Sequence, residues 1–202
     1  MSDRADSFDW SGGHPALDFV NTLDERPFPS PIENLAIYLD LVRFAQLAGL
    51  IDRAAATRLK KHCRPEHSRL AKRARDLREH LHDLLAAVDR RRPVPKKHLA
   101  AIAAAIQAAH SAHGLVMSDS WGLAGRQWSE PRAPEIPLHA CALAIEDLLV
   151  NIDRTKIRKC GATDCGVYFV DTSKAHRRQW CSMKNCGNRE KQKRWRSGTP
   201  DA

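Results

Sequence analysis

The chain has 202 residues, of which 43% are hydrophobic, so it can form one medium domain or a domain with a small appendage, and disorder throughout is excluded. Its formal net charge of +9 indicates an anionic partner or a well-solvated surface. The residues from Asn151 onward hold 13 Lys and Arg against 5 Asp and Glu, a net charge of +8, whereas the preceding part carries only +1. Nearly all of the excess positive charge therefore lies in the last quarter of the chain.

The sequence indicates a protein that neither crosses a membrane nor is exported. No apolar run approaches the ~20 residues that a membrane-spanning helix needs. The first residues include Asp3, Asp6 and Asp9 and lack the basic-then-apolar order of a secretion signal. We therefore expect a cytoplasmic protein without a membrane partner. In that reducing compartment, clustered cysteines are more often metal ligands than disulfides.

The first segment contains a group of polar residues next to apolar sequence. Residues 1–13 are polar and end in Ser-Gly-Gly, which predicts a flexible lead-in. Helical spacing would then place His14, Asp18 and Asn21 on one side of the following segment. Two interpretations are open: these side chains line a small-molecule pocket, or they orient hydrogen bonds within the domain.

A series of helices is predicted for the middle of the chain. Residues 30–33, Ser-Pro-Ile-Glu, resemble a capping box with proline at the first helical position, and predict a helix that ends at Gly49. A short helix should follow Asp52. Apolar periodicity and breaking residues predict three more, from Pro65 to Arg92, from the alanine-rich segment to Gly114, and from Leu138 to Asp153.

Between Gly114 and Trp128 the pattern predicts a β-hairpin. An apolar stretch, a turn at Ser118–Ser120 and a Gly-containing stretch follow one another there. The predicted fold class is therefore α+β, with a mostly helical domain over residues 14–153 that includes a small β-hairpin or sheet.

Four cysteines occur as two pairs with equal spacing. Cys160 and Cys165 enclose four residues, Cys181 and Cys186 also enclose four, and fifteen residues separate the pairs. Two short clips joined by a turn supply the tetrahedral set of thiolates that zinc prefers. Two disulfides or four unrelated thiols are the alternatives, which the expected compartment disfavours. We predict one zinc ion, structural rather than catalytic, because four protein ligands leave no open coordination position.

The segment between the two cysteine pairs is predicted to form a β-hairpin. Residues 167–170 and 178–180 alternate in polarity around a turn that begins at Asp171. After Cys186 the pattern is helical, with Asn188 as the N-cap.

Two segments resemble known families. The sequence Cys-Ser-Met-Lys-Asn-Cys-Gly-Asn-Arg at residues 181–189, with the strand at 169–171 ahead of it, closely resembles the CGNR zinc finger family. Residues 14–23 resemble the opening of the ABATE domain, which accompanies this finger in bacterial proteins described as stress-induced transcription regulators. The resemblances imply an ABATE-like domain over residues 14–153, a treble-clef-like zinc finger over residues 154–202, and a regulatory role in DNA binding.

Basic residues around the second cysteine pair indicate a nucleic-acid surface. Helical spacing places three of them on one face of the last helix, and three from the predicted hairpin extend that face. The alternative is a merely solvated surface, on which Arg189 packs against the zinc site. Trp180 and Trp195 either stack on bases or supply apolar packing. The predicted contacts are Lys174, Arg177, Arg178, Arg189, Lys193 and Arg196.

We therefore predict a transcription regulator that binds duplex DNA through the zinc finger. Its N-terminal domain would sense a small-molecule effector or mediate association. A homodimer is expected because a single finger reads too few bases for high specificity. The alternatives are a zinc-stabilised module that binds protein or RNA, and an enzyme in the N-terminal domain. We expect no enzyme, because the sequence has no Gly-rich phosphate loop, nucleophile elbow or paired catalytic carboxylates.

Overall fold

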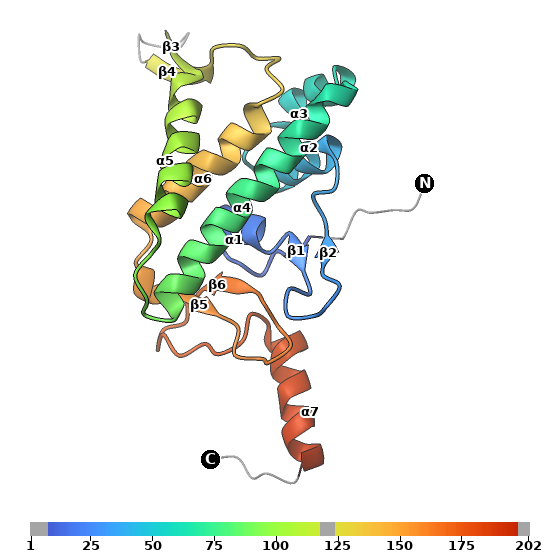
Figure 1. Ribbon diagram of the computed structural model, residues 1–202, viewed down its shortest axis with the longest axis vertical. Coiled ribbons are helices and arrows are strands. Elements are labelled where there is room, and N and C mark those ends of the chain that lie inside the picture. The colour runs from blue at the N-terminus through green and yellow to red at the C-terminus, as the bar shows by residue number, and fades with distance from the viewer. Residues whose placement is uncertain (1–7, 118–123, 198–202) are drawn as a thin grey trace. The chain divides into compact units, whose positions relative to one another are not determined.

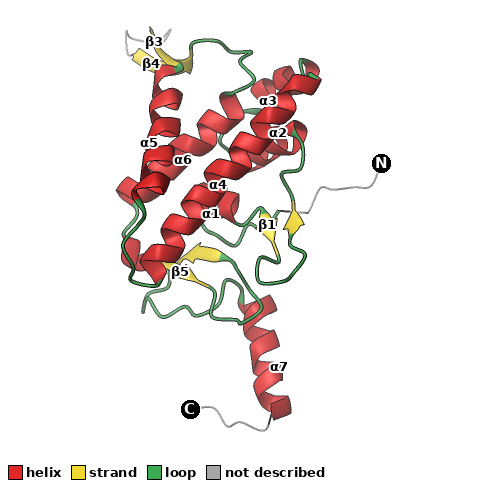
Figure 2. Cartoon of the chain, in the orientation of Figure 1, coloured by secondary structure: helices red, strands yellow, loops and turns green. Residues whose placement is uncertain are grey.

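The computed structural model describes residues 8–117 and 124–197. They form two compact units: the zinc unit combines the segment up to Asn34 with the segment from Ile152 onward, and the helical unit is Leu35–Asn151. Figures 1 and 2 show that helices dominate and that the strands are short. The predicted mostly helical α+β class is confirmed. None of the described helices has the length and apolar character needed to cross a membrane.

The helical unit buries a core of aliphatic side chains. Leu70 and Leu81 from one helix, Ile102 from the next, and Ile145 and Leu148 from the last are almost completely buried. The helices predicted from apolar periodicity after residue 50 are confirmed, with ends shifted by a few residues. The elements are α2 (Tyr38–Leu47), α3 (Arg53–Lys61), η1 (Pro65–His67), α4 (Ser68–Asp89), α5 (Lys96–Ser111) and α6 (Ile136–Asn151).

The predicted capping box at residues 30–33 is wrong. Residues Ile32–Glu33 form strand β2, which pairs antiparallel with β1 (Leu23–Asp24). Helix α2 instead begins after Ile37, whose backbone N–H donates to the carboxylate of Asp40 at 3.0 Å. The Ser-Pro-Ile-Glu pattern describes only local preference, and here the pairing with a preceding strand prevails.

The hairpin predicted between Gly114 and Trp128 is confirmed. Strands β3 (His113–Met117) and β4 (Ala124–Trp128) pair antiparallel, with His113 opposite Trp128. The rings of these two residues stack with centroids 3.8 Å apart. The predicted turn at Ser118–Ser120 lies outside the described residues.

The zinc unit joins both ends of the sequence. Its remaining elements are α1 (Pro15–Val20), η2 (Arg154–Lys156), β5 (Ile157–Lys159), β6 (Tyr168–Val170), η3 (Met183–Gly187) and α7 (Asn188–Ser197). The backbone N–H of Val170 donates to the carbonyl of Gly12 at 2.8 Å, and Phe8 is buried. The described part of the predicted flexible lead-in, residues 8–13, is thus tied to the segment that carries the cysteines.

The hairpin predicted between the cysteine pairs has the wrong strand partner. Strand β6 pairs with β5, which precedes the first cysteine, and not with residues 178–180. Asp171 explains the difference, since its buried carboxylate accepts a hydrogen bond from the backbone N–H of Arg178 at 2.9 Å. This bond closes a loop instead of continuing the strand ladder.

Candidate metal centre and nucleic-acid interface

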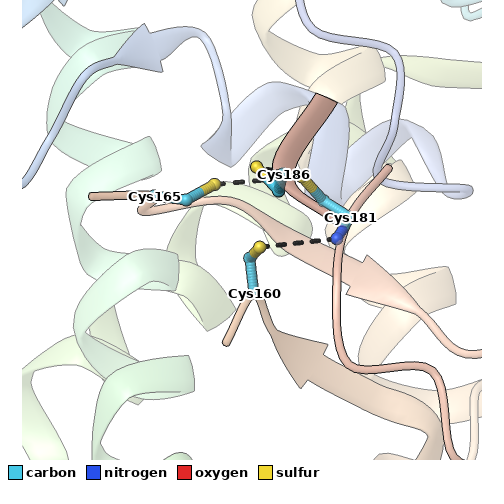
Figure 3. A group of neighbouring side chains, drawn as sticks. All are labelled: Cys160, Cys165, Cys181 and Cys186. Carbon is cyan, nitrogen blue, oxygen red and sulfur yellow. Dashed lines mark hydrogen bonds between the residues drawn. The ribbon is translucent and has the colours of Figure 1, made fainter. Parts of the chain in front are cut away.

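The four predicted ligands come together in the zinc unit (Figure 3). All four sulfur atoms lie within 4.8 Å of one another. Cys160 follows β5, Cys165 precedes β6, and Cys186 lies in the π-helical turn η3. The Sγ atom of Cys181 is 3.8 Å from that of Cys165 and 3.6 Å from that of Cys186.

These distances fit a zinc ion bound by four thiolates. With Zn–S bonds of ~2.3 Å, a tetrahedron has sulfur–sulfur edges of about 3.8 Å. Hydrogen bonds from Cys165 and Cys181 lower the pKa of the Cys160 thiol, whereas the contacts of Cys181 with Cys160 and Cys165 raise the pKa of the Cys181 thiol. Such thiols share protons when no cation balances their charge, and a dication removes this conflict because it binds thiolates. The protein therefore has one structural zinc site.

Backbone hydrogen bonds shape the loops around the ligands. The N–H of Cys160 donates to Val167 at 2.9 Å, and the N–H of Gly187 donates to Ser182 at 2.9 Å. A Cβ atom on Gly187 would lie 2.8 Å from the sulfur of Met183, so a larger residue would require this flexible side chain to move.

Cys63 and Cys141, which have no partners at ligand spacing in the sequence, take no part in the cluster. The four-cysteine group is the one potential metal-binding set found among the described residues. Cys141 is buried in α6, and this burial raises the pKa of its thiol, so it stays protonated and inert at neutral pH.

The helical segment that contains Cys186 begins earlier than predicted and has a different N-cap. Asn188 has helical backbone angles and its side chain donates to the carbonyl of Lys184 at 3.2 Å. The predicted N-cap at Asn188 is therefore wrong. Ser182 caps instead, with its hydroxyl accepting from the N–H of Asn185 at 3.3 Å. The π-helical turn makes η3 and α7 one continuous helical segment. A sequence pattern interpreted as regular α-helix does not predict this continuity.

Two of the predicted DNA contacts bind the loop between the first two cysteines. Arg189 donates to Asp164 at 2.8 Å and contacts the sulfur of Cys186 at 3.4 Å. Lys193 lies 3.1 Å from Asp164 and 2.9 Å from Glu190. The hydrogen bond from Lys193 lowers the pKa of Asp164, which keeps this carboxylate charged. Both cations therefore also help to fix α7 against the metal centre.

Arg178 has a structural environment. Its Nε donates to the carbonyl of Trp180 at 2.9 Å, and another guanidinium nitrogen donates to the carbonyl of Cys181. The guanidinium lies 4.5 Å from the centre of the Phe169 ring. Removing this side chain would disturb the loop that presents Cys181, so a loss of binding in such a variant would not identify a DNA contact.

Helix α7 presents a concentrated positive charge. It carries five Lys and Arg residues against one acid, Glu190, and none of its side chains over residues 188–196 is buried. Trp195 is 86% exposed, whereas Trp180 packs against the apolar core beside the cysteines. Lys191 and Arg196 have no ion pair among the described residues. Lys191 is absent from the predicted contacts because helical spacing places it away from the face of Arg189. Its positive charge was the sequence signal that could have identified it.

The predicted pocket residues hold the zinc unit together. The side-chain amide of Asn21 donates to the carbonyl of Tyr168 and accepts from its N–H, both at 3.0 Å. Asp18 accepts from the N–H of Gly12 at 2.9 Å, and His14 caps α1. These contacts favour the structural interpretation of the three side chains. A ligand pocket at His14, Asp18 and Asn21 stays a prediction.

A cavity of about 540 Å³ adjoins the metal centre within the zinc unit. Its walls include Cys165, Trp10 and Phe28, and Asp9 and Arg189 add charges of opposite sign. The cavity is also lined by Cys181 and Cys186, although the four ligands fill the coordination of the metal.

The fold and the metal centre define a protein with a helical unit and a four-cysteine zinc finger. A family model described as ABATE, a putative stress-induced transcription regulator, matches residues 13–151. The CGNR zinc finger model matches residues 156–197. The chain belongs to the ABATE family and ends in a CGNR zinc finger, as the sequence resemblance implied. A search of curated proteins finds no match.

Proposed function

We propose that the protein is a transcription regulator that binds duplex DNA through the surface of α7. The family assignment supports a regulator. The observation that carries DNA binding is the helix itself, which has a net charge of +4 over ten residues and is anchored at its start by Cys186. A ten-residue helix is ~15 Å long and fits the major groove of B-DNA.

The contacts that we propose are the exposed cations of α7 and of the preceding loop. Lys191 and Arg196 have no competing carboxylate among the described residues, and Lys193 can exchange its surface ion pairs for phosphate at little cost. Lys174 and Arg177 are exposed and would extend the contact. Arg189 and Arg178 contribute more to shape than to contact, because the metal loops already engage their guanidinium groups.

Binding to labelled duplex and to single-stranded RNA of the same length tests this function. The zinc-loaded protein should bind duplex, and protein treated with a chelator should lose that affinity, because α7 depends on the metal turn. Genomic fragments selected by the protein are the appropriate duplexes, since no operator is identified. Unchanged duplex affinity after complete zinc removal would contradict the proposal. So would the failure of the zinc-loaded protein to bind duplex at low salt.

One observation favours a second candidate function, the binding of single strands. Trp195 is almost fully exposed on the basic helix, and an exposed indole can stack on an unpaired base. Much tighter binding to RNA than to duplex, together with a loss of RNA binding in Trp195→Ala, would establish this candidate in place of the first. A homodimer, a small-molecule effector, a cytoplasmic location and a non-enzymatic role remain our expectations.

A further inference from the structure

The helical unit contains a cavity of about 790 Å³ that the zinc finger does not use. It lies among the segment between α2 and α3, helix α3 itself, and β4 with the chain that follows it, and all of its lining residues belong to Leu35–Asn151. The connection from β4 to α6 can be followed in Figure 1. The volume falls in the range of small-molecule sites, about 300–1,000 Å³.

One wall of this cavity is apolar and aromatic. Ile51 and Ala55 are buried lining residues, and Leu50 is partly buried beside them. Trp128 lines the cavity and is held in place by its stack on His113 at 3.8 Å. A fixed indole next to aliphatic side chains offers a surface for a flat or apolar ligand body.

The polar part of the lining is basic. Arg58, Arg126 and Arg132 line the cavity with two acids, Asp52 and Glu130. Both acids are already engaged by backbone groups, since Asp52 accepts from the N–H of Ala55 at 2.6 Å and Glu130 accepts from the N–H of Arg132 at 3.0 Å.

The arginines keep donors available. Arg58 and Arg132 have no ion pair among the described residues, and one guanidinium nitrogen of Arg126 lies 3.4 Å from the ring of His110. A planar guanidinium with free N–H groups recognises carboxylate, sulfonate or phosphate with two parallel hydrogen bonds. The three arginines and two acids give the lining a net charge of +1, which favours an anionic ligand over a cationic one.

We propose that this cavity, the arginine–tryptophan site, binds a small organic anion with an aromatic or otherwise apolar body. The body packs against Trp128, Ile51 and Ala55, and the anionic group pairs with Arg58 and Arg132. This site is separate from the metal centre, so it can exist whether or not α7 binds DNA.

Two fluorescent probes that differ in charge test the site. Anilinonaphthalene sulfonate carries an aromatic body and an anionic group, and phenylnaphthylamine has the same body without the charge. The full-length, zinc-loaded protein should bind one equivalent of the sulfonate saturably, and about tenfold or more tighter than the neutral probe. Equal affinity for the two probes, or no saturable binding of the sulfonate, would overturn the proposal.

Variants locate the binding. Arg58→Gln combined with Arg132→Gln should weaken sulfonate binding about tenfold or more, because two charge-assisted contacts are lost. Arg90→Gln combined with Arg92→Gln removes the same charge from exposed positions outside the cavity and should leave the affinity unchanged. Trp128→Leu should weaken both probes. Thermal melting of each variant establishes that it is folded. Equal loss in the two double-arginine variants would mean non-specific attraction and would also overturn the site.

Discussion

Asn21 connects the two ends of the sequence with one side chain. Its amide pairs with both backbone groups of Tyr168, 147 residues away. In Asn21→Ala both buried backbone groups would lose their partners, and each such loss costs about 1–3 kcal/mol. We expect a lower melting temperature and weaker zinc retention in chelator competition. Asn151→Ala, at the end of α6, is the control and should change neither. Unaltered melting and zinc retention in Asn21→Ala would show that the pair contributes little.

Asp18 gives the zinc unit a pH dependence of its own. Burial raises the pKa of this carboxyl from 3.8 to about 6, despite the hydrogen bond from Gly12. Because the folded-state pKa is the higher one, the folded state binds more protons between these values, and the contribution of Asp18 to stability falls as pH rises from 3.8 to about 6.

Asp18→Asn should remove this dependence. The difference in unfolding free energy, variant minus wild type, should increase as pH rises from about 5 to about 6 and then level off. Comparing variant with wild type cancels the zinc ligands' own titration. Carboxyl carbon chemical shifts of Asp18 should show a midpoint near pH 6, and a midpoint near 4 would contradict the assignment.

At the residue scale, sequence spacing identified the metal ligands but not their partners. Four cysteines in two equal clips predict their own proximity, because one ion must bind all of them. Nothing local relates Arg189 to Asp164 or Asn21 to Tyr168, since these pairs depend on the folded chain. The structural contacts of Arg178 and Arg189 also depend on the folded chain. Sequence alone therefore cannot distinguish these two arginines from the other cations of the zinc finger.

Elements of the zinc unit were harder to predict than those of the helical unit. Long helices such as α4 bury one apolar face, so the apolar periodicity of their sequence predicts them. Strand β6 has only three residues, all of them buried, and its pairing with β5 rather than with residues 178–180 depends on Asp171. Short strands and the π-helical turn η3 take their geometry from tertiary contacts and metal binding, which periodicity cannot report.

Helix α7 should depend on zinc. No side chain of residues 188–196 is buried, and an isolated helix of this length is marginal in water. Removing zinc, or replacing Cys165 or Cys186 with serine, should therefore release the amides of α7 to rapid hydrogen exchange. Cys63→Ser should retain zinc and the protected amides. If the α7 amides exchange equally fast with and without zinc, the metal does not order this helix.

The two compact units of the molecule do not coincide with the two family matches along its sequence. The ABATE match covers residues 13–151, yet the first part of that range, up to Asn34, belongs to the zinc unit. The boundary predicted between residues 153 and 154, at which the chain would divide into two independently folding domains, remains a prediction. Composition could not reveal this division, because the residues that flank α1, Gly12 and Asn21, join β6 through specific hydrogen bonds rather than through a change in residue type.

Fragments test the division into units. A chain of residues 35–151 should melt cooperatively and retain helical signal, because its core is its own. A peptide of residues 152–202 should bind zinc about tenfold or more weakly than the full-length protein, since it lacks Gly12 and Asn21 as partners for β6. Metal competition measures the second quantity. Equal zinc affinity in the peptide would show that the finger folds without the N-terminal segment.

The salt dependence of duplex affinity tests the proposed DNA contact of α7 most directly. Each phosphate contact releases condensed cations, so the logarithm of the association constant falls with the logarithm of salt concentration by about 0.9 per contact. The triple variant Lys191→Gln, Lys193→Gln and Arg196→Gln should keep zinc and flatten this slope by about two to three units. The matched triple Arg92→Gln, Lys96→Gln and Lys97→Gln should keep the wild-type slope. An unchanged slope and affinity in the zinc-loaded α7 variant would contradict the account.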